Sequence, residues 1–241
     1  MSKTLIDGDI IAYRVAFSCK DKSIKLALES VDEMIDYILE ECSFHNATGD
    51  YEVYLTGKGN FRTEISTTHV YKGNRKGVEK PVHLDAIRDY LITDYSATVS
   101  LGEEADDLIA KEATKVGSTA IVASADKDML QIPATHFNFN KGVWKNVTEK
   151  EGLKFFYTQI LTGDSADNIY GLYRVGPVKA KKILEGCETE EDLWEAVINA
   201  YDGDLERVLE NARLLWLRRY EGEIWEPPDQ RKQKEEKGNK K

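Results

Sequence analysis

The sequence contains few cysteines, few histidines and no long apolar run. Its three cysteines, Cys19, Cys42 and Cys187, are widely spaced, which argues for a reducing cytoplasm and against a disulfide framework or a zinc site. The four histidines have no paired spacing, which argues against histidine-based metal chemistry. No stretch approaches the roughly 20 apolar residues that a membrane span needs, and no signal-peptide pattern opens the chain. The sequence therefore predicts a cytoplasmic protein without a membrane segment.

The net charge of −10 at first argues against a nucleic-acid partner. The placement of charge matters more than its sum, because many acids occur in tight clusters. Basic residues concentrate at Lys72 to Lys80, Arg174 to Lys182 and Arg231 to Lys241. An acidic composition is therefore compatible with a DNA enzyme whose clustered acids bind metal. The length of 241 residues allows one good core, with a small appended domain.

Short apolar runs alternate with helical patterns in the first 150 residues. Residues 4–6 are typical of a buried strand that ends in a loop at Asp7-Gly8-Asp9. Further strands are predicted at residues 51–56, 119–123, 136–139 and 142–147, and helices at residues 26–39, 82–92 and 105–116. This alternation predicts an α/β fold with a mostly parallel sheet flanked by helices, in which ligands bind beyond the carboxyl ends of the strands. From residue 155 onward the pattern is helical, and residues 230–241 are expected to be a charged, disordered tail.

Four acidic groups are the most informative feature of the sequence. They lie at strand ends or near helix starts, and their members are Asp7; Glu104, Asp106 and Asp107; Asp126 and Asp128; Asp164 and Asp167. Unpaired carboxylates at this density would repel one another, and hard divalent cations such as Mg²⁺ or Mn²⁺ relieve that repulsion. Two such ions can hold a phosphodiester and activate the attacking water. For one cluster alone helix capping is the commoner explanation, but four clusters in this order favour metal binding.

Several motifs follow one another in order between residues 4 and 184. They are Ile6-Asp7-Gly8 with Arg14, then Tyr71-Lys72-Gly73-Asn74-Arg75, Glu104-Ala105-Asp106-Asp107, Ser124-Ala125-Asp126-Lys127-Asp128, Gly163-Asp164 with Asp167-Asn168-Ile169, and Gly171 with Val175-Gly176-Pro177 and Lys179-Ala180. This ordered combination resembles the flap endonuclease family, and especially the bacteriophage 5′–3′ exonucleases.

The resemblance implies a PIN-like nuclease core over residues 1–154, followed over residues 155–229 by a helix–three-turn–helix DNA-binding element and C-terminal helices. It assigns Asp7, Glu104, Asp106 and Asp107 to one metal ion, and Asp126, Asp128, Asp164 and Asp167 to a second. It implies that Lys72, Arg75 and Arg14 stabilise the negative charge that develops on the scissile phosphate. It implies contacts with the DNA backbone at Arg174, Gly176, Lys179, Lys181 and Lys182, and a K⁺ ion in the same element.

The resulting expectation is a 5′–3′ exonuclease or flap endonuclease that uses two Mg²⁺ or Mn²⁺ ions. It would hydrolyse DNA phosphodiesters at duplex ends, flaps, nicks or branched structures and leave a 5′-phosphate and a 3′-hydroxyl. The resemblance also implies a monomer that works in phage replication or host-genome breakdown, in the cytoplasm of a bacterial host.

The chain departs from the family pattern in two places. The family usually has an aspartate after the second strand, where this chain has Thr56-Gly57-Lys58-Gly59, and Asp9 or Glu64 is a candidate substitute. The segment from residue 77 to 102 is short for the helical arch of the family. A reduced arch favours exonucleolytic work on duplex ends over strict threading of flaps.

Two alternative hypotheses about function are compatible with the sequence. A haloacid-dehalogenase-like phosphatase would use Asp7 and Asp9 as a nucleophile pair, but it needs a strand before Gly163, where residues 155–161 look helical. A non-catalytic DNA-structure binder would account for the missing aspartate. The eight clustered acids argue against a pure binder, because they repel DNA.

Overall fold

The computed structural model describes residues 2–45 and 49–238, and the chain forms two compact units. The first unit contains the residues up to Asn60, Gly77–Glu149 and Arg219–Glu221. The second contains Phe61–Lys76, Lys150–Arg218 and the chain from Gly222 onward. Residues 61–76 thus belong to the second unit, whereas the boundary drawn from the sequence assigns them to the first domain. The expected extents of the domains remain a prediction.

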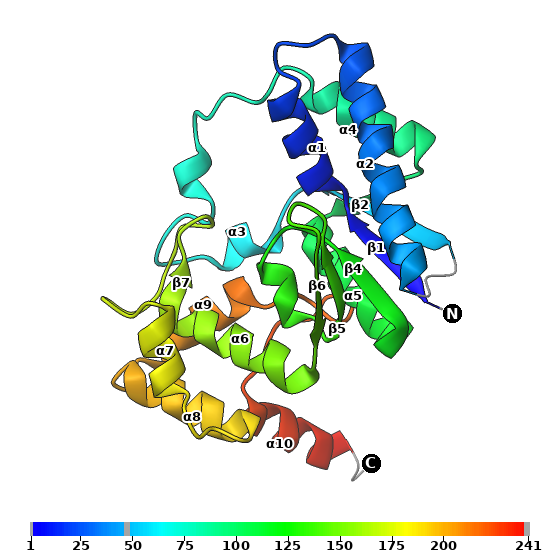
Figure 1. Cartoon of the computed structure of the whole chain (residues 1–241). Coiled ribbons are helices and arrows are strands. Elements are labelled where there is room, and N and C mark those ends of the chain that lie inside the picture. The colour runs from blue at the N-terminus through cyan, green and yellow to red at the C-terminus, as the bar shows by residue number, and fades with distance from the viewer. Residues whose placement is uncertain (1, 46–48, 239–241) are drawn as a thin grey trace. The chain divides into compact units, whose positions relative to one another are not determined.

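The first unit is built on a six-stranded sheet with the order β3-β2-β1-β4-β5-β6 (Figure 1). The strands are β1 (Lys3–Asp7), β2 (Asp50–Lys58), β3 (Thr98–Leu101), β4 (Ala120–Ala123), β5 (Ala134–Asn138) and β6 (Val143–Val147). All neighbouring pairs are parallel except the β5–β6 hairpin. The predicted α/β fold with a mostly parallel sheet is confirmed.

Helices cover both faces of this sheet. They are α1 (Gly8–Ser18), α2 (Ile24–Phe44), α4 (Leu84–Asp94) and α5 (Ala105–Val116). Alternate residues of β1 point to opposite faces. Ile6 lies in the core that α1, α2 and α4 share, whereas Lys3 pairs with Glu112 of α5 on the other face. Within the described residues, no helix combines the length and the apolar composition needed to cross a bilayer.

One predicted segment of the first unit was wrong. Asp7-Gly8-Asp9 is not a loop: β1 continues directly into α1, and Asp7 is the N-cap of that helix. Glycine at residue 8 makes this possible, because a Cβ there would lie 2.7 Å from the carbonyl oxygen of Tyr54. The segment 77–102, for which the resemblance implies a shortened arch, contains the predicted helix as α4 and the edge strand β3, which pairs with β2. The arch assignment itself remains a prediction. Only one residue of β3, Ser100, is buried, so no apolar run marks this strand in the sequence.

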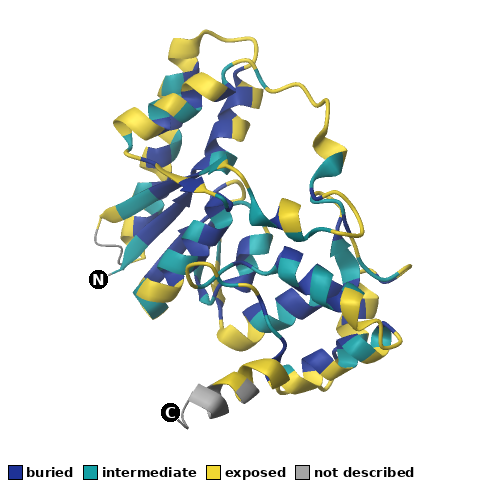
Figure 2. Ribbon diagram, turned by 180° about the vertical axis from the view of Figure 1, so that it is seen from behind, coloured by how far each residue is buried: buried dark blue, intermediate teal, exposed yellow. Residues whose placement is uncertain are grey.

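The second unit is mainly helical, as the sequence predicts. Its elements are α3 (Phe61–Ile65), η1 (Gly73–Arg75), most of α6 (Glu149–Thr162), β7 (Gly163–Asp164), β8 (Ile169–Tyr170), α7 (Pro177–Ile183), α8 (Glu190–Ala200), α9 (Leu205–Leu215) and α10 (Pro228–Gly238). A separate apolar core contains Phe156, Ile160, Trp194 and Val208. Figure 2 shows buried residues on the central strands of the sheet and on the inner sides of the helices, with exposed residues on the outer sides of the helices.

A two-stranded hairpin, β7–β8, follows α6 directly. A Cβ at Gly163 would lie 2.3 Å from the backbone nitrogen of Gly171, and one at Gly171 would lie 2.4 Å from that of Gly163. Two backbones therefore meet here without room for a side chain. The hairpin is the scaffold on which the acidic residues of this unit are placed.

The expectation of a disordered tail over residues 230–241 was wrong for most of that segment. Helix α10 extends from Pro228 to Gly238, and residues 239–241 lie outside the described residues. Basic residues of this hydrophilic segment attach it to α8. Arg231 pairs with Glu190 of α8, and Lys232 pairs with Glu191.

Candidate active site

The parallel strands of the first unit bring acidic residues to one edge of the sheet. Asp7 is the last residue of β1, and it lies level with Ser124 because Ile6 is in register with Ala123 of β4. Glu104 follows β3, and Asp126 follows β4. Since the carboxyl ends of parallel strands meet at the same edge, the topology gathers these residues where α/β sheets bind ligands.

Asp7 is the buried centre of this edge, with an exposed fraction of 2%. Its Oδ2 accepts a hydrogen bond from Ser124 Oγ (2.6 Å), and its Oδ1 accepts one from the backbone N–H of Ile10 (3.1 Å). The same Ser124 Oγ accepts the N–H of Asp126 (3.0 Å). Burial raises the pKa of Asp7 to about 7, and the charges of Asp9 and Asp126 act in the same direction. A carboxyl group in this setting would keep its charge more readily beside a cation.

The acids at the start of α5 are also helix caps. Asp107 is fully buried, and its Oδ2 accepts the N–H of Glu104 (3.1 Å), which is the N-cap residue. After β4, Asp126 Oδ1 accepts the N–H of Asp128 (2.9 Å). These contacts are those that the capping explanation of a single cluster requires. They leave the metal assignment of these residues a prediction.

Asp9 has a structural role at the end of β2. Its Oδ2 accepts the N–H of Thr56 (2.9 Å), and it forms an ion pair with Arg88 of α4, which also donates to the carbonyl oxygen of Thr56. Thr56 Oγ1 in turn accepts the N–H of Ala105, the first residue of α5 (2.9 Å). The network therefore braces β2 against α1, α4 and α5. Of the two candidate substitutes for the missing aspartate, Asp9 is held in this network, and Glu64 lies on α3 of the second unit.

In the second unit, two of the predicted catalytic cations, Lys72 and Arg75, pair with a predicted metal ligand, Asp167. Asp167 Oδ1 lies 2.8 Å from a guanidinium nitrogen of Arg75 and 3.6 Å from Lys72 Nζ. Asp167 Oδ2 accepts the hydroxyl of Tyr71 (2.8 Å). The backbone reinforces this, because the N–H of Lys72 donates to the carbonyl oxygen of Asp167 (2.9 Å). Lys72 adopts a left-handed backbone with φ of 52°, which is costly for a residue with a side chain.

The turn that carries Lys72 is tied to the loop after β7. Asn74 donates to the carbonyl oxygen of Ser165 (2.8 Å), and Asn168 donates to that of Val70 (2.9 Å). Asp164, the last residue of β7, is 5% exposed, and its Oδ1 accepts the N–H of Ala166 in the loop (2.7 Å). Hydrogen bonds therefore join the turn to the loop, although the two lie about ninety positions apart in the chain.

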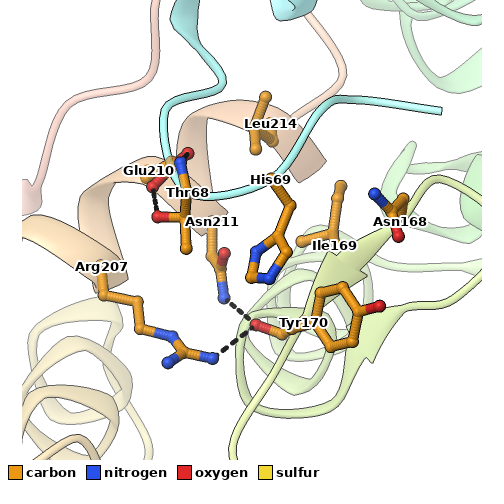
Figure 3. Close-up of a pocket in the computed structure, with 9 residues that line it drawn as sticks. All are labelled: Thr68, His69, Asn168, Ile169, Tyr170, Arg207, Glu210, Asn211 and Leu214. Atoms are coloured by element: carbon orange, nitrogen blue, oxygen red, sulfur yellow. Dashed lines mark hydrogen bonds between the residues drawn. The ribbon is translucent and has the colours of Figure 1, made fainter. Parts of the chain in front are cut away.

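Helix α9 contacts both the segment before the Lys72 turn and strand β8 (Figure 3). Glu210 accepts the backbone N–H groups of Thr67 (2.5 Å) and Thr68 (2.8 Å), just before the turn. Arg207 and Asn211 both donate to the carbonyl oxygen of Tyr170 in β8 (3.3 and 2.9 Å). These contacts form one side of a small pocket, in which the His69 and Tyr170 rings lie 4.3 Å apart.

The two units each carry part of the predicted site. The first unit carries Asp7, Glu104, Asp106, Asp107, Asp126, Asp128 and Arg14, which is exposed on α1. The second carries Lys72, Arg75, Asp164 and Asp167, together with the exposed residues Arg174, Gly176, Lys179, Lys181 and Lys182 at α7. Across the part of the chain that the structure describes, no three His, Cys, Asp or Glu side chains are arranged to hold a metal ion. The donor set is nevertheless made of carboxylate oxygens alone, which suits Mg²⁺ or Mn²⁺.

Sequence reasoning missed the residues that position these groups. Ser124 and Tyr71 both lie inside the motifs, directly beside the charged residues, and each donates a hydroxyl to a predicted metal ligand. Their place in the motifs was a usable signal. Arg88 and Glu210 carried no signal, because each acts on a segment far away in the chain.

The comparisons with known proteins settle the family. A family model described as "5′-3′ exonuclease, N-terminal resolvase-like domain" matches residues 2–159. The chain belongs to this family. The phosphatase hypothesis is excluded by this membership. It also requires a strand before Gly163, where the structure has helix α6.

Curated relatives are similar to the chain over most of its length. DNA polymerase I of Bacillus subtilis (strain 168) is 30% identical over 230 residues, which cover 86% of this chain and 26% of the relative. The chain thus spans about a quarter of the length of the DNA polymerases I that it matches. The 5′-3′ exonuclease of Mycoplasma genitalium is 28% identical over 238 residues, covering 87% of this chain and 80% of the relative.

The fold is also that of a solved nuclease. A bacteriophage T5 flap endonuclease in a pseudo-enzyme–product complex with DNA and metal ions has a TM-score of 0.68 and 20% identity. The match covers 89% of each chain. At this identity the likeness supports the fold alone.

Proposed function

We propose that this protein is a divalent-metal-dependent 5′-nuclease, a 5′–3′ exonuclease or flap endonuclease that hydrolyses DNA phosphodiesters. The observation that carries the proposal is that Glu104, Asp126 and buried Asp7 all stand at the ends of parallel strands on one edge of the sheet, in a member of the 5′-3′ exonuclease family. A pure binder would gain nothing from these charges, because they repel phosphates. The products would be a 5′-phosphate and a 3′-hydroxyl.

The proposed ligands are the eight acids predicted from the sequence, and Mg²⁺ is the proposed ion. Divalent ions at such a site supply positive charge that polarises the scissile phosphate and activates water. Ser124 orients Asp7 by holding its Oδ2, so that Oδ1 and the neighbouring acids keep a fixed arrangement. The T5 neighbour was solved with DNA and metal ions, which supports the use of metal ions by this fold and says nothing of the individual ligands.

Lys72 and Arg75 are proposed to stabilise the negative charge that develops on the phosphate, with Arg14 of the first unit as a third donor. Before substrate arrives, Asp167 holds Lys72 and Arg75 beside one another. That arrangement lowers the cost of ordering two long side chains when the phosphate binds. Exchange of Asp167 for phosphate oxygens would release the carboxylate toward a metal ion.

The exposed residues around α7 are proposed to bind the DNA backbone. Arg174, Lys179, Lys181 and Lys182 all have exposed side chains within nine positions of one another, and Gly176 is the N-cap residue of the helix. Backbone contacts of this kind position a duplex without reading its sequence. The resemblance to the flap endonuclease family is the basis for four further proposals. These are the helix–three-turn–helix assignment, a K⁺ ion in that element, a monomeric state and a phage setting.

The decisive experiment incubates the purified protein with 5′-labelled duplex, flap and hairpin DNA, with Mg²⁺ and with EDTA. We expect cleavage in Mg²⁺ and none in EDTA. Asp7→Asn should remove cleavage, whereas Asp85→Asn, a change in an acid whose side chain is 82% exposed on α4, should not. DNA binding without cleavage in any divalent metal would favour the non-catalytic binder and overturn the proposal.

A further inference from the structure

The second unit contains an open pocket that none of the predicted site residues lines. Its volume is about 670 Å³, within the range of small-ligand sites. Its wall includes Tyr170 of β8, Tyr173 just after it, Asn74 and Arg207. All of these residues belong to the second unit.

The two tyrosines present unusually exposed rings. Tyr173 is 82% exposed and Tyr170 is 54% exposed. Each ring is backed by a polar group on one side: the His69 ring lies 4.3 Å from that of Tyr170 (Figure 3), and the Arg174 guanidinium lies 5.0 Å from the centre of the Tyr173 ring. A ring that is supported on one side and open on the other is prepared for a planar ligand, because little ordering remains to be done on binding.

The backbone holds Tyr173 outward at a local cost. Tyr173 and Arg174 are the central residues of a turn closed by the N–H of Val175 and the carbonyl oxygen of Leu172 (3.1 Å). Arg174 has φ of 58°, a left-handed conformation that a residue with a side chain rarely adopts. Strained positions of this kind persist at functional sites, where the surrounding structure enforces them.

Basic residues belong to the wall of the pocket and to the turn beside it. Asn74 in its wall belongs to the same turn as Lys72 and Arg75. Arg207, also in the wall, donates to the carbonyl oxygens of Tyr170 (3.3 Å) and Gly171 (3.1 Å). Aromatic faces beside basic side chains are the combination that binds single-stranded nucleic acid, since bases stack on the rings while phosphates meet the cations.

We propose that this pocket binds one unpaired nucleobase of a nucleic-acid strand by stacking on Tyr173 and Tyr170. The inference rests on the proposed function for the identity of the strand, and it adds a substrate preference to it. A base held here places the neighbouring phosphates of its strand beside the turn that carries Lys72 and Arg75. Substrates with at least one unpaired nucleotide, such as a frayed end, a gap or a flap, are therefore bound more tightly than a blunt duplex.

The test uses DNA that carries a single 2-aminopurine at successive positions of an unpaired segment, in EDTA so that no strand is cut. Stacking on an aromatic ring quenches the fluorescence of this base. We expect one position to be quenched on binding to the wild-type protein. Tyr173→Ala should abolish that quenching and weaken binding of this DNA about tenfold, whereas Tyr173→Phe should preserve both.

A matched control is Tyr220→Ala, which removes a tyrosine that is 66% exposed in the first unit and should change nothing. Blunt duplex should bind Tyr173→Ala as it binds the wild type. Quenching that is equal in wild type and Tyr173→Ala, while Mg²⁺-dependent cleavage is normal, overturns the inference and leaves the proposed function intact. If the free 2-aminopurine nucleotide is quenched equally strongly, the pocket does not require a nucleic-acid strand. That result overturns the proposal and favours a mononucleotide site. Absence of both binding and cleavage would instead sink the proposed function.

Discussion

At the scale of single residues, Asp167 is the group on which the second half of the site depends. Its carboxylate pairs with the guanidinium of Arg75 and the ammonium of Lys72, and it accepts a hydrogen bond from the hydroxyl of Tyr71. Its backbone carbonyl accepts the N–H of Lys72. Lys72 is partly buried in this arrangement, with its side chain 25% exposed. Its charge is thus held in place before any phosphate is present.

Replacement of Lys72 by alanine should lower the cleavage rate about 100- to 1,000-fold, which is the usual cost of removing one preorganised donor from a developing charge. DNA affinity should change little, because the proposed backbone contacts at α7 remain. Single-turnover cleavage and a separate binding titration measure the two effects. Lys76→Ala is the matched control, since Lys76 is exposed at the end of the same turn. A rate near that of the wild type in Lys72→Ala would remove this lysine from the mechanism.

The acidic and basic candidates could be named from the sequence because motifs carry them in order, and their metal and catalytic roles remain predictions. The residues that contact them could not be named from the sequence. Asp107 shows why: its spacing from Glu104 fits both a metal site and a helix cap, and the structure shows the cap contact. Asp9 looked available from the sequence, and the structure shows it paired with Arg88, seventy-nine positions away. Such contacts follow from the fold, and periodicity does not encode them.

At the scale of elements, the junction between β2 and β3 depends on one glycine. A Cβ at Gly57 would lie 1.9 Å from the carbonyl oxygen of Ser100, and the N–H of Gly57 donates to Ser100 Oγ (3.0 Å). The register between the two strands shifts at this point, between Leu55 and Lys58. An aspartate installed at Gly57 would therefore push β3 away before it could act as a ligand.

Gly57→Ala should reduce the free energy of unfolding by about 1–3 kcal/mol, the usual cost of forcing extra atoms into a packed site. Urea denaturation of the intact protein measures the change. Gly176→Ala serves as the control for stability, because its Cβ would meet nothing within 4 Å. If both variants unfold at the same urea concentration, the close approach of the two strands is relaxed in solution.

A second element depends on a buried arginine. Arg62 of α3 is 1% exposed, and its guanidinium donates to the carbonyl oxygens of Leu214 (2.8 Å) and Trp216 (2.7 Å) at the end of α9. Both carbonyls belong to the last turn of a helix or the residue after it, where no intrahelical partner is available. The charge of Arg62 is thus used to close α9 and to attach α3 to it.

Arg62→Leu should destabilise the protein by about 2–4 kcal/mol, because charged hydrogen bonds are lost and buried carbonyl oxygens lose their donor. Thermal or urea denaturation would show this as a loss of stability with the second unit affected first. Lys150→Leu removes a surface ion pair with Glu188 and should cost less than about 1 kcal/mol. Comparable losses in the two variants would mean that the interior hydrogen bonds of Arg62 contribute no more than a surface pair.

Most elements could be predicted because their apolar residues repeat with the right period, and Ala105–Val116 has the predicted bounds. The failures have physical causes. Strand β3 is short and mostly exposed, and helix α1 begins directly at a strand end because Gly8 permits close packing. Helix α10 has no apolar stripe, and ion pairs with α8 hold it. In each case the deciding contact comes from a segment distant in the chain.

At the scale of the whole molecule, the charge of −10 makes any DNA affinity depend on where the positive groups lie. The acids of the sheet edge repel phosphates unless cations neutralise them, so the exposed basic residues at α7 must provide attraction at long range. Lys179 and Lys181 are both exposed on a helix that begins after Gly176. Affinity should therefore fall steeply as salt rises, in proportion to the number of phosphates contacted.

The double variant Lys179→Ala with Lys181→Ala should weaken duplex binding and reduce the slope of log affinity against log salt concentration by about 2, because about one counterion is released for each lysine–phosphate contact. Binding measured in EDTA between low and moderate salt gives this slope without cleavage. Lys20→Ala with Lys25→Ala removes the same charge from exposed positions near the start of α2, and should lower affinity only through the small change in net charge. Because the two variants have equal net charge, a difference in slope between them reports local phosphate contacts, and equal slopes would show that the α7 lysines do not touch the duplex.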